Sequence, residues 1–299
     1  LLEEWEIGHV GAGRNIEEAW QPFITKANGL TVAILAVAEN EFGISDVDKP
    51  GAAGVDMYRL YHTIQSSKQK ADFVMVIFHG GNEYNPLPSP RVVSRYRLVI
   101  DFGADAVVGM HPHCPQGHET YNGKPIVYSV GNFLFCERTV SDPNSPWYYG
   151  YIPIITFSKA GLPTLDITPY TFDPECTRIT PMEGERRKIM LEYLDRISSY
   201  FKDPEEHMRL FKGWCLIGGP SYANHLKFSS DFLEEDRCFD DITLLRLRNL
   251  FTCEAHNELM TTLLKMVSDR DLKTGYEMVE KVKALQKMPV ENICKKEGH

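Results

Sequence analysis

The architecture is indicated most clearly by two stretches, Asp72-Phe-Val-Met-Val-Ile-Phe-His-Gly-Gly-Asn-Glu-Tyr84 and Ala106-Val-Val-Gly-Met-His-Pro-His113. Each begins with an apolar run of the length of a buried strand and passes directly into histidines. Gly80-Gly81 ends the first run, and residues 91–102 between the two stretches read as a helix. Strand, helix, strand is typical of a parallel sheet with a crossover helix, so both strands are expected to end at one sheet edge.

The same alternation continues on both sides of these stretches. Residues 30–38 are a further buried-strand run, residues 55–70 have a broad apolar helical face, and residues 125–130 read as a fourth strand. Residues 152–158 and 165–170 read as a strand pair. We therefore predict an α/β fold, with sheets flanked by helices, over residues 1–175.

Helical periodicity dominates the rest of the chain, residues 176–299. The expected helices cover residues 183–201, 204–212, 242–267 and 273–287, and Gly218-Gly219-Pro220 reads as a turn. Their apolar faces are expected to pack on each other and on the α/β part. We expect this region to serve structure or partner binding, with Glu254 and His256 outside the functional site.

Composition excludes some classes of function and location. The formal net charge of −9 argues against a nucleic-acid-binding protein, because phosphate neutralisation needs a basic surface. No apolar run has the length of about 20 residues that a membrane-spanning helix needs. The acidic start of the chain, with Glu3, Glu4 and Glu6, is not a secretory signal. Seven cysteines without paired spacing indicate reduced thiols and a cytoplasmic protein.

The histidines carry most of the chemical information. His79 follows one predicted strand, and His111 and His113 follow the next, so all three lie at the edge where open α/β sheets bind ligands. We expect Pro112 to hold an extended segment in which His111 and His113 point the same way. They could then share one metal ion or contact two. Imidazole is a common ligand of zinc, manganese and iron.

Several nearby residues leave alternatives open. Glu83 could orient a histidine, bind an amine of a substrate or be an exposed loop acid, and Glu119 is open to the same interpretations. Asn132 could bind an active-site group or only form a turn. Arg14, in a glycine-rich loop, could contact a phosphate or carboxylate. Cys114 reads as a buried thiol more readily than as a ligand.

A family resemblance emerges from the combined motifs. Residues 79–84 (HGGNEY), 101–113 (DFGADAVVGMHPH), Glu119 and residues 121–133 (YNGKPIVYSVGNF) resemble the bacterial capsule-synthesis CapA/PgsA family, which is associated with poly-γ-glutamate capsules. The resemblance covers roughly residues 5–175. This family is similar to the calcineurin-like metallophosphoesterases, which are sandwiches of sheets flanked by helices with two metal ions at the strand ends.

The resemblance implies roles for individual residues. His79 and His111 would bind one divalent metal ion, of manganese, zinc or iron, and His113 the other. Arg14, Glu83, Tyr84, Glu119 and Asn132 would bind substrate or support the ligands. The family's first strand with its aspartate, its Asn-Leu-Glu segment and its Asn-Asn-His segment have no counterpart here, which implies an N-terminally incomplete domain. Three neutral histidines compensate little cationic charge, so we expect this chain to hold at most one ion tightly.

The implied function is capsule or poly-γ-glutamate biosynthesis through metal-assisted hydrolysis of a phosphoester. The implied partners are an anionic polymer or a phosphorylated substrate, and a capsule-synthesis complex. Two alternatives stay open: a non-catalytic accessory protein that binds the polymer or the complex, and hydrolysis of a γ-glutamyl amide with the same metals.

Overall fold

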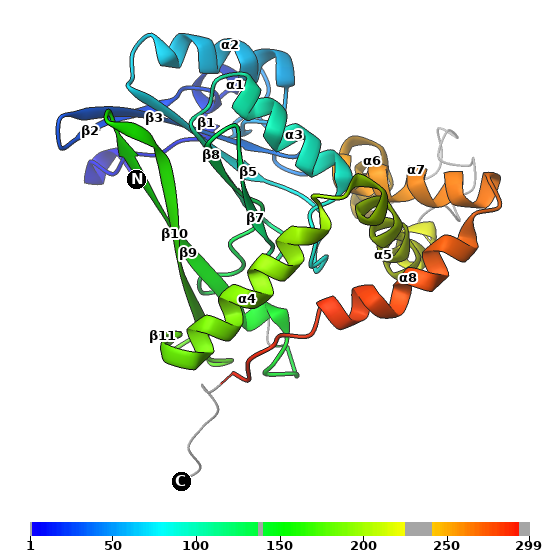
Figure 1. Cartoon of the computed structure of the whole chain (residues 1–299). Coiled ribbons are helices and arrows are strands. Elements are labelled where there is room, and N and C mark those ends of the chain that lie inside the picture. Colours follow the sequence, from blue (N-terminus) through cyan, green and yellow to red (C-terminus); the bar gives the residue numbers. More distant parts are fainter. Residues whose placement is uncertain (1, 137–139, 225–240, 293–299) are drawn as a thin grey trace, which may run out of the picture.

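The computed structural model describes residues 2–136, 140–224 and 241–292 (Figure 1). A six-stranded sheet has the order β2-β3-β5-β6-β8-β7, in which β3, β5, β6 and β8 are parallel and the two outer strands are antiparallel to their neighbours. Its strands are β2 (Phe23–Ala27), β3 (Leu30–Ala38), β5 (Phe73–His79), β6 (Ala106–Met110), β7 (His118–Tyr121) and β8 (Lys124–Val127).

A second, antiparallel sheet has the order β11-β10-β9. Its strands are β9 (Tyr149–Ser158), β10 (Gly161–Phe172) and β11 (Ile179–Pro181). The short strands β1 (Ala12–Gly13) and β4 (Gly51–Ala52) pair with each other. The helices are α1 (Ile16–Ala19), α2 (Met57–Lys68), α3 (Pro90–Asp101), α4 (Gly184–Tyr200), α5 (Pro204–Asn224), α6 (Asp241–Thr252), α7 (Glu254–Ser268) and α8 (Leu272–Leu285), with 3-10 turns at Glu3–Trp5 and Pro146–Tyr148.

Helices cover one face of the large sheet. Alternate residues of β5, such as Val74 and Val76, are fully buried against apolar side chains of α2 and α3, including Leu60 and Val99. Local capping sets where these helices begin. Asp56 accepts hydrogen bonds from two backbone N–H groups of α2, and Ser89 caps α3 with proline at its first turn.

The opposite face of the large sheet packs against the small sheet and α4. Val108 and Val127 share a buried cluster with Tyr151, Ile167 and side chains of α4, α5, α7 and α8. The predicted α/β fold, with sheets flanked by helices and a C-terminal helical region, is therefore confirmed. Because one core contains side chains from both sides of residue 175, the two-part division of the chain stays a prediction.

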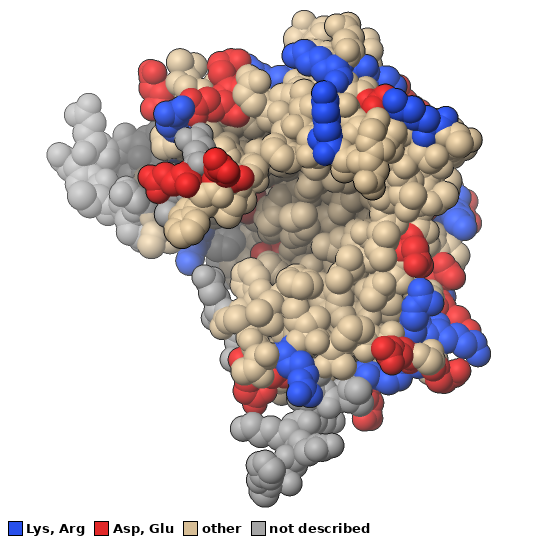
Figure 2. All heavy atoms as spheres, turned by 90° about the vertical axis from the view of Figure 1, so that its left-hand side faces the viewer, with Lys and Arg blue, Asp and Glu red and all other residues tan. Residues whose placement is uncertain are grey.

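The two sheets leave an apolar groove between them. Val32, Ile34 and Met75 line it from the large sheet, and Ile155 and Phe157 line it from β9. Its cavity volume is about 420 Å³. Figure 2 shows the side of the molecule that holds β2 and the β9–β10 hairpin: its centre is hollowed and nearly uncharged, and charged side chains gather at the rim.

Two expectations about the helical region were wrong. Gly218-Gly219-Pro220 does not form a turn but lies inside α5, where a Cβ at position 219 would come within 2.6 Å of Leu263. Close packing on α7 therefore outweighs the local signal for a turn. Residues 242–267 form not one helix but two, α6 and α7, because Cys253 adopts an extended backbone with φ −75° and ψ 122°.

Gly109 of β6 gives a test of the sheet that carries the histidines. A Cβ here would lie 2.1 Å from the carbonyl oxygen of Tyr128, the residue that follows neighbouring β8, and the backbone cannot yield easily. We expect Gly109→Ala to lower the free energy of unfolding by about 1–3 kcal/mol, as overpacking does. Gly161→Ala, where a Cβ meets nothing within 4 Å, is the matched control. Equal urea-unfolding midpoints for both variants would contradict this packing.

Candidate metal centre

The three predicted histidines lie together because two parallel strands end side by side. His79 is the last residue of β5 and pairs in register with Met110, the last residue of β6. Gly80 N–H donates to the Met110 carbonyl over 3.0 Å, which holds the two chain ends together. His111 and His113 follow directly, so all three imidazoles lie at the carboxyl edge of the sheet.

The backbone around His111 and His113 is not extended, as we expected, but turned. His111 has φ 104° and His113 has φ 55°, both in the left-handed region that non-glycine residues seldom occupy. Tyr84, in the facing loop, has φ 60°, and its N–H donates to the Pro112 carbonyl over 2.7 Å. Such backbone strain is typical of functional sites.

The imidazole nitrogens have spacings suited to a metal ion. His79 Nε2 lies 3.1 Å from His111 Nδ1, and two nitrogens bound to one tetrahedral zinc ion are about 3.3 Å apart. The ring centroids of His111 and His113 are 5.8 Å apart. Ligand atoms of Glu83, His111 and His113 lie within 4.8 Å of one another. The residues present therefore fit a divalent ion.

Asn132 determines which nitrogen of His113 carries its proton. The Asn132 amide nitrogen donates to the Trp147 carbonyl over 3.1 Å, so its oxygen must be the atom that lies 2.8 Å from His113 Nδ1. An amide oxygen only accepts, so Nδ1 is protonated and Nε2 keeps its lone pair. This is the common arrangement around metal-binding histidines.

Burial favours the neutral form of two of the rings, those of His79 and His111. Burial, followed by the neighbouring rings of His79 and His113, lowers the pKa of His111 to about 4. Burial and His113 also lower the pKa of His79. A metal ion binds the neutral form of imidazole, so no proton has to be removed from these rings at neutral pH.

Acidic residues border a cavity beside the histidines. The cavity volume is about 340 Å³, and its lining includes Glu39, Glu41, His79 and His111. Burial alone raises the pKa of Glu39, but the Arg91 and Arg95 guanidinium groups outweigh it and hold that pKa below its usual value. Burial raises the pKa of Glu41, whose Oε1 lies 4.0 Å from His111 Nε2.

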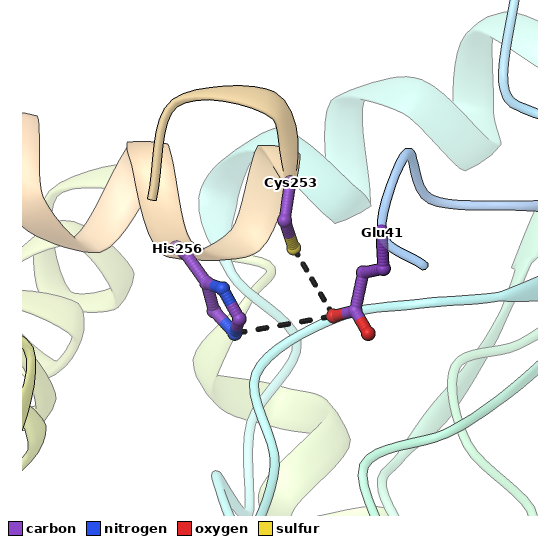
Figure 3. A group of neighbouring side chains, drawn as sticks. All are labelled: Glu41, Cys253 and His256. Carbon is purple, nitrogen blue, oxygen red and sulfur yellow. Dashed lines mark hydrogen bonds and ion pairs between the residues drawn. The ribbon is translucent and has the colours of Figure 1, made fainter. Parts of the chain in front are cut away.

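Residues far along the sequence complete this edge. Cys253 precedes α7, His256 lies in its first turn, and both point toward Glu41 (Figure 3). Cys253 Sγ and His256 Nε2 lie 3.2 Å and 3.9 Å from Glu41 Oε1. His256 therefore lies beside the predicted site, where we did not expect it, whereas the contacts of Glu254 are with Asn40 and Arg95. That this helical region takes no part in catalysis stays a prediction. The Cys-x-x-His spacing of Cys253 and His256 was the signal in the sequence that could have indicated this pair.

Several polar contacts hold the N-terminal end of α7 against the α/β part. Glu254 accepts hydrogen bonds from the backbone and side chain of Asn40, and Asn82 donates to the carbonyl of Ala255. Glu258 accepts from Ser89 and Arg91. These contacts explain why apolar periodicity alone did not predict the position of α7.

Some sequence candidates have other surroundings. The Arg14 side chain is 81% exposed and pairs with Glu18. Both carboxylate oxygens of Glu119 are engaged by Arg97, and the Tyr128 hydroxyl donates to one of them. The Tyr84 ring stacks 6.2 Å from that of His113. The buried Cys114 thiol donates to the Asn85 carbonyl.

Comparison with known proteins agrees with this arrangement of motifs. Residues 1–137 match the family described as bacterial capsule synthesis protein PGA_cap. Residues 1–137 are therefore similar to this family, and the rest of the chain lies outside the match. No helix among the described residues has the length and apolarity needed to cross a bilayer.

Curated relatives of the PGA_cap segment carry capsule-related names. The capsule biosynthesis protein CapA of Bacillus anthracis is 34% identical over 45% of this chain and 34% of its own length. The PGA biosynthesis protein CapA of Bacillus subtilis is 28% identical over 64% and 50%. A probable polyglutamine synthesis accessory protein of Mycobacterium tuberculosis is 33% identical over 43% and 37%. The chain thus spans about a third to a half of these relatives.

Among solved structures, a putative 5'-nucleotidase from Staphylococcus aureus in complex with alpha-ketoglutarate is similar to 64% of this chain and matches over 36% of its own. The TM-score is 0.35 and the sequence identity is 10%. A TM-score of this size supports no conclusion about the activity of this protein.

The role of Asn132 can be tested directly. We expect Asn132→Ala to remove the partner of His113 Nδ1–H, to shift that ring toward its other tautomer, and to weaken metal binding about 10- to 100-fold. Nitrogen-15 NMR of the histidine rings and a zinc titration measure both effects. Asn122→Ala, whose side chain bonds Asp101 instead, is the control. An unchanged tautomer and affinity in Asn132→Ala would contradict this assignment.

Proposed function

We propose that this protein acts in capsule or poly-γ-glutamate biosynthesis by metal-dependent hydrolysis of a phosphoester. The observation that carries the proposal is the convergence of His79, His111 and His113 at one sheet edge, with two of their nitrogens 3.1 Å apart. The family match over residues 1–137 and the names of the relatives support the biological setting.

In this proposal, His79, His111 and His113 hold a manganese, zinc or iron ion. When bound, such an ion polarises a phosphoryl oxygen and activates water. Asn132 keeps the lone pair of His113 Nε2 directed toward the site, and the hydrogen-bonded strand ends fix the other two rings. Glu83 is the exposed carboxylate beside His111 and His113 and compensates part of the positive charge.

The substrate would bind in the cavity beside His79 and His111. Its volume of about 340 Å³ is near the lower end for small-molecule sites, so one phosphorylated group fits better than a long polymer segment. Tyr84 borders the histidines through its stacking with His113 and would contact a substrate there. The proposal keeps a cytoplasmic location, which rests on the cysteine pattern of the sequence.

A second candidate is a non-catalytic accessory role within a synthesis complex. It is favoured by the name of the Mycobacterium tuberculosis relative, a probable polyglutamine synthesis accessory protein. Hydrolysis of a γ-glutamyl amide would use the same three histidines. All three functions require the histidine edge to bind a ligand, but only the two hydrolytic reactions, of a phosphoester and of a γ-glutamyl amide, require turnover.

The experiment compares the wild-type chain with His111→Ala and with His62→Ala, a change on the outer helix α2. We expect zinc- or manganese-dependent hydrolysis of an aryl phosphate, reduced at least about 100-fold in His111→Ala because a ligand is lost, and unchanged in His62→Ala. Hydrolysis of a γ-glutamyl anilide but not the phosphate would favour the amidase. Binding of poly-γ-glutamate without turnover of either compound would favour the accessory role and contradict the hydrolase.

A further inference from the structure

We infer that Glu41, Cys253 and His256 form a second metal site, for a zinc-class ion, beside the histidine edge. The three residues come from the loop after β3 and from the start of α7, and their side chains point toward one another (Figure 3). One oxygen, one sulfur and one nitrogen atom lie within 4.8 Å of each other. Thiolate, imidazole and carboxylate together are a ligand set that zinc prefers.

The distances require only small adjustments. Ligand atoms around a tetrahedral zinc ion are about 3.4–3.6 Å apart when the bonds are about 2.0–2.3 Å long. Cys253 Sγ and His256 Nε2 are 3.2 Å and 3.9 Å from Glu41 Oε1. Shifts of less than about 1 Å, within the range of side-chain rotation, would bring the three atoms to these separations.

The break between α6 and α7 creates this geometry. Cys253 is the N-cap of α7, and His256 follows three residues later, so both side chains lie on the same face of the first turn. The cap position has no side-chain hydrogen bond to the helix, although serine, threonine, aspartate and asparagine are preferred there. A cysteine at this position therefore contributes little as a cap, whereas its thiol is fully buried next to Glu41.

An independent observation comes from Asn249, a buried residue that is only 7% exposed. Its amide lies 3.2 Å from His256 Nδ1, and its oxygen has no hydrogen-bond partner. Turning the amide by a half rotation makes that oxygen accept from Nδ1–H of His256. The His256 Nε2 lone pair then faces Glu41 and Cys253, as a metal ligand requires.

Glu41 connects this set to the histidine edge. The same oxygen that contacts Cys253 and His256 lies 4.0 Å from His111 Nε2, while His111 Nδ1 faces His79. The His111 ring thus lies between the two groups of ligands, with Nδ1 toward His79 and Nε2 toward Glu41. An ion at Glu41 would lie across this ring from an ion at His79, a step that rests on the histidine site of the proposed function, whereas the thiolate site stands without it.

The test uses the full chain, freed of metal by a chelator and titrated with cobalt. Cobalt bound to a thiolate gives a strong charge-transfer absorption in the near ultraviolet, which imidazole and carboxylate do not give. We expect this absorption in the wild-type chain and in Cys215→Ser, another fully buried thiol, and its loss in Cys253→Ser. Bound zinc, measured by mass spectrometry after dialysis, should fall by one equivalent in Cys253→Ser only.

Further variants keep the test decisive. If Cys253→Ser unfolds, His256→Gln retains the thiol and should weaken cobalt binding in this absorption about 10-fold or more. Absence of the absorption in the wild-type chain, or its persistence in a folded Cys253→Ser, would overturn the inference. His111→Ala should keep the absorption while losing the cobalt held by the histidines. If the wild-type chain shows the absorption but does not hydrolyse the aryl phosphate, the result contradicts the proposed hydrolysis and leaves this site standing.

Discussion

One buried carboxylate, Glu39, joins the parts of the molecule that form the site. Its Oε1 lies 2.7 Å from Arg91 and 3.3 Å from Arg95 of α3, and Arg91 also pairs with Glu258 of α7 over 2.9 Å. Removing one member of such a buried pair leaves an uncompensated charge and costs about 3–5 kcal/mol. The end of β3, helix α3 and helix α7 therefore keep fixed positions relative to one another.

The same carboxylate also positions the histidine edge. Glu39 N–H donates to the His79 carbonyl over 2.9 Å, and Glu39 Oε2 accepts from Gly81 N–H over 3.2 Å. A Cβ at Gly80 would lie 2.4 Å from the Glu39 side chain, so the glycine allows the turn after β5 to close over it. The turn after His79 therefore depends on two features: the hydrogen bond from Gly81 to the Glu39 carboxylate, and the absence of a side chain at Gly80.

The sequence predicted well those features that depend on local pattern. The run at residues 30–38 became β3, and the apolar stretches before His79 and His111 became neighbouring parallel strands. The turned backbone at His111 and His113 could not be predicted, because it depends on contacts with the loop of Tyr84. The position of α7 could not be predicted either, because contacts across more than 160 residues, such as Ser89 with Glu258, place it. Only the spacing of Cys253 and His256 pointed to its chemistry.

The charges of the residues around the histidine edge bear on which ions and substrates it can bind. Glu39 is neutralised by its arginines, so it cannot offset a cation in the cavity. Glu41, Glu83 and a Cys253 thiolate would provide about three negative charges against the four of two divalent ions. The expectation of a single tightly held ion allowed for Glu83 and Glu119 but not for Glu41 or Cys253, and it stays a prediction that the second site would change. The remaining positive charge of about one would face the cavity beside His79 and His111, where it favours an anionic substrate. A phosphoester and the α-carboxylates of a γ-glutamyl chain both meet that condition, so turnover and not charge must separate the two hydrolytic reactions.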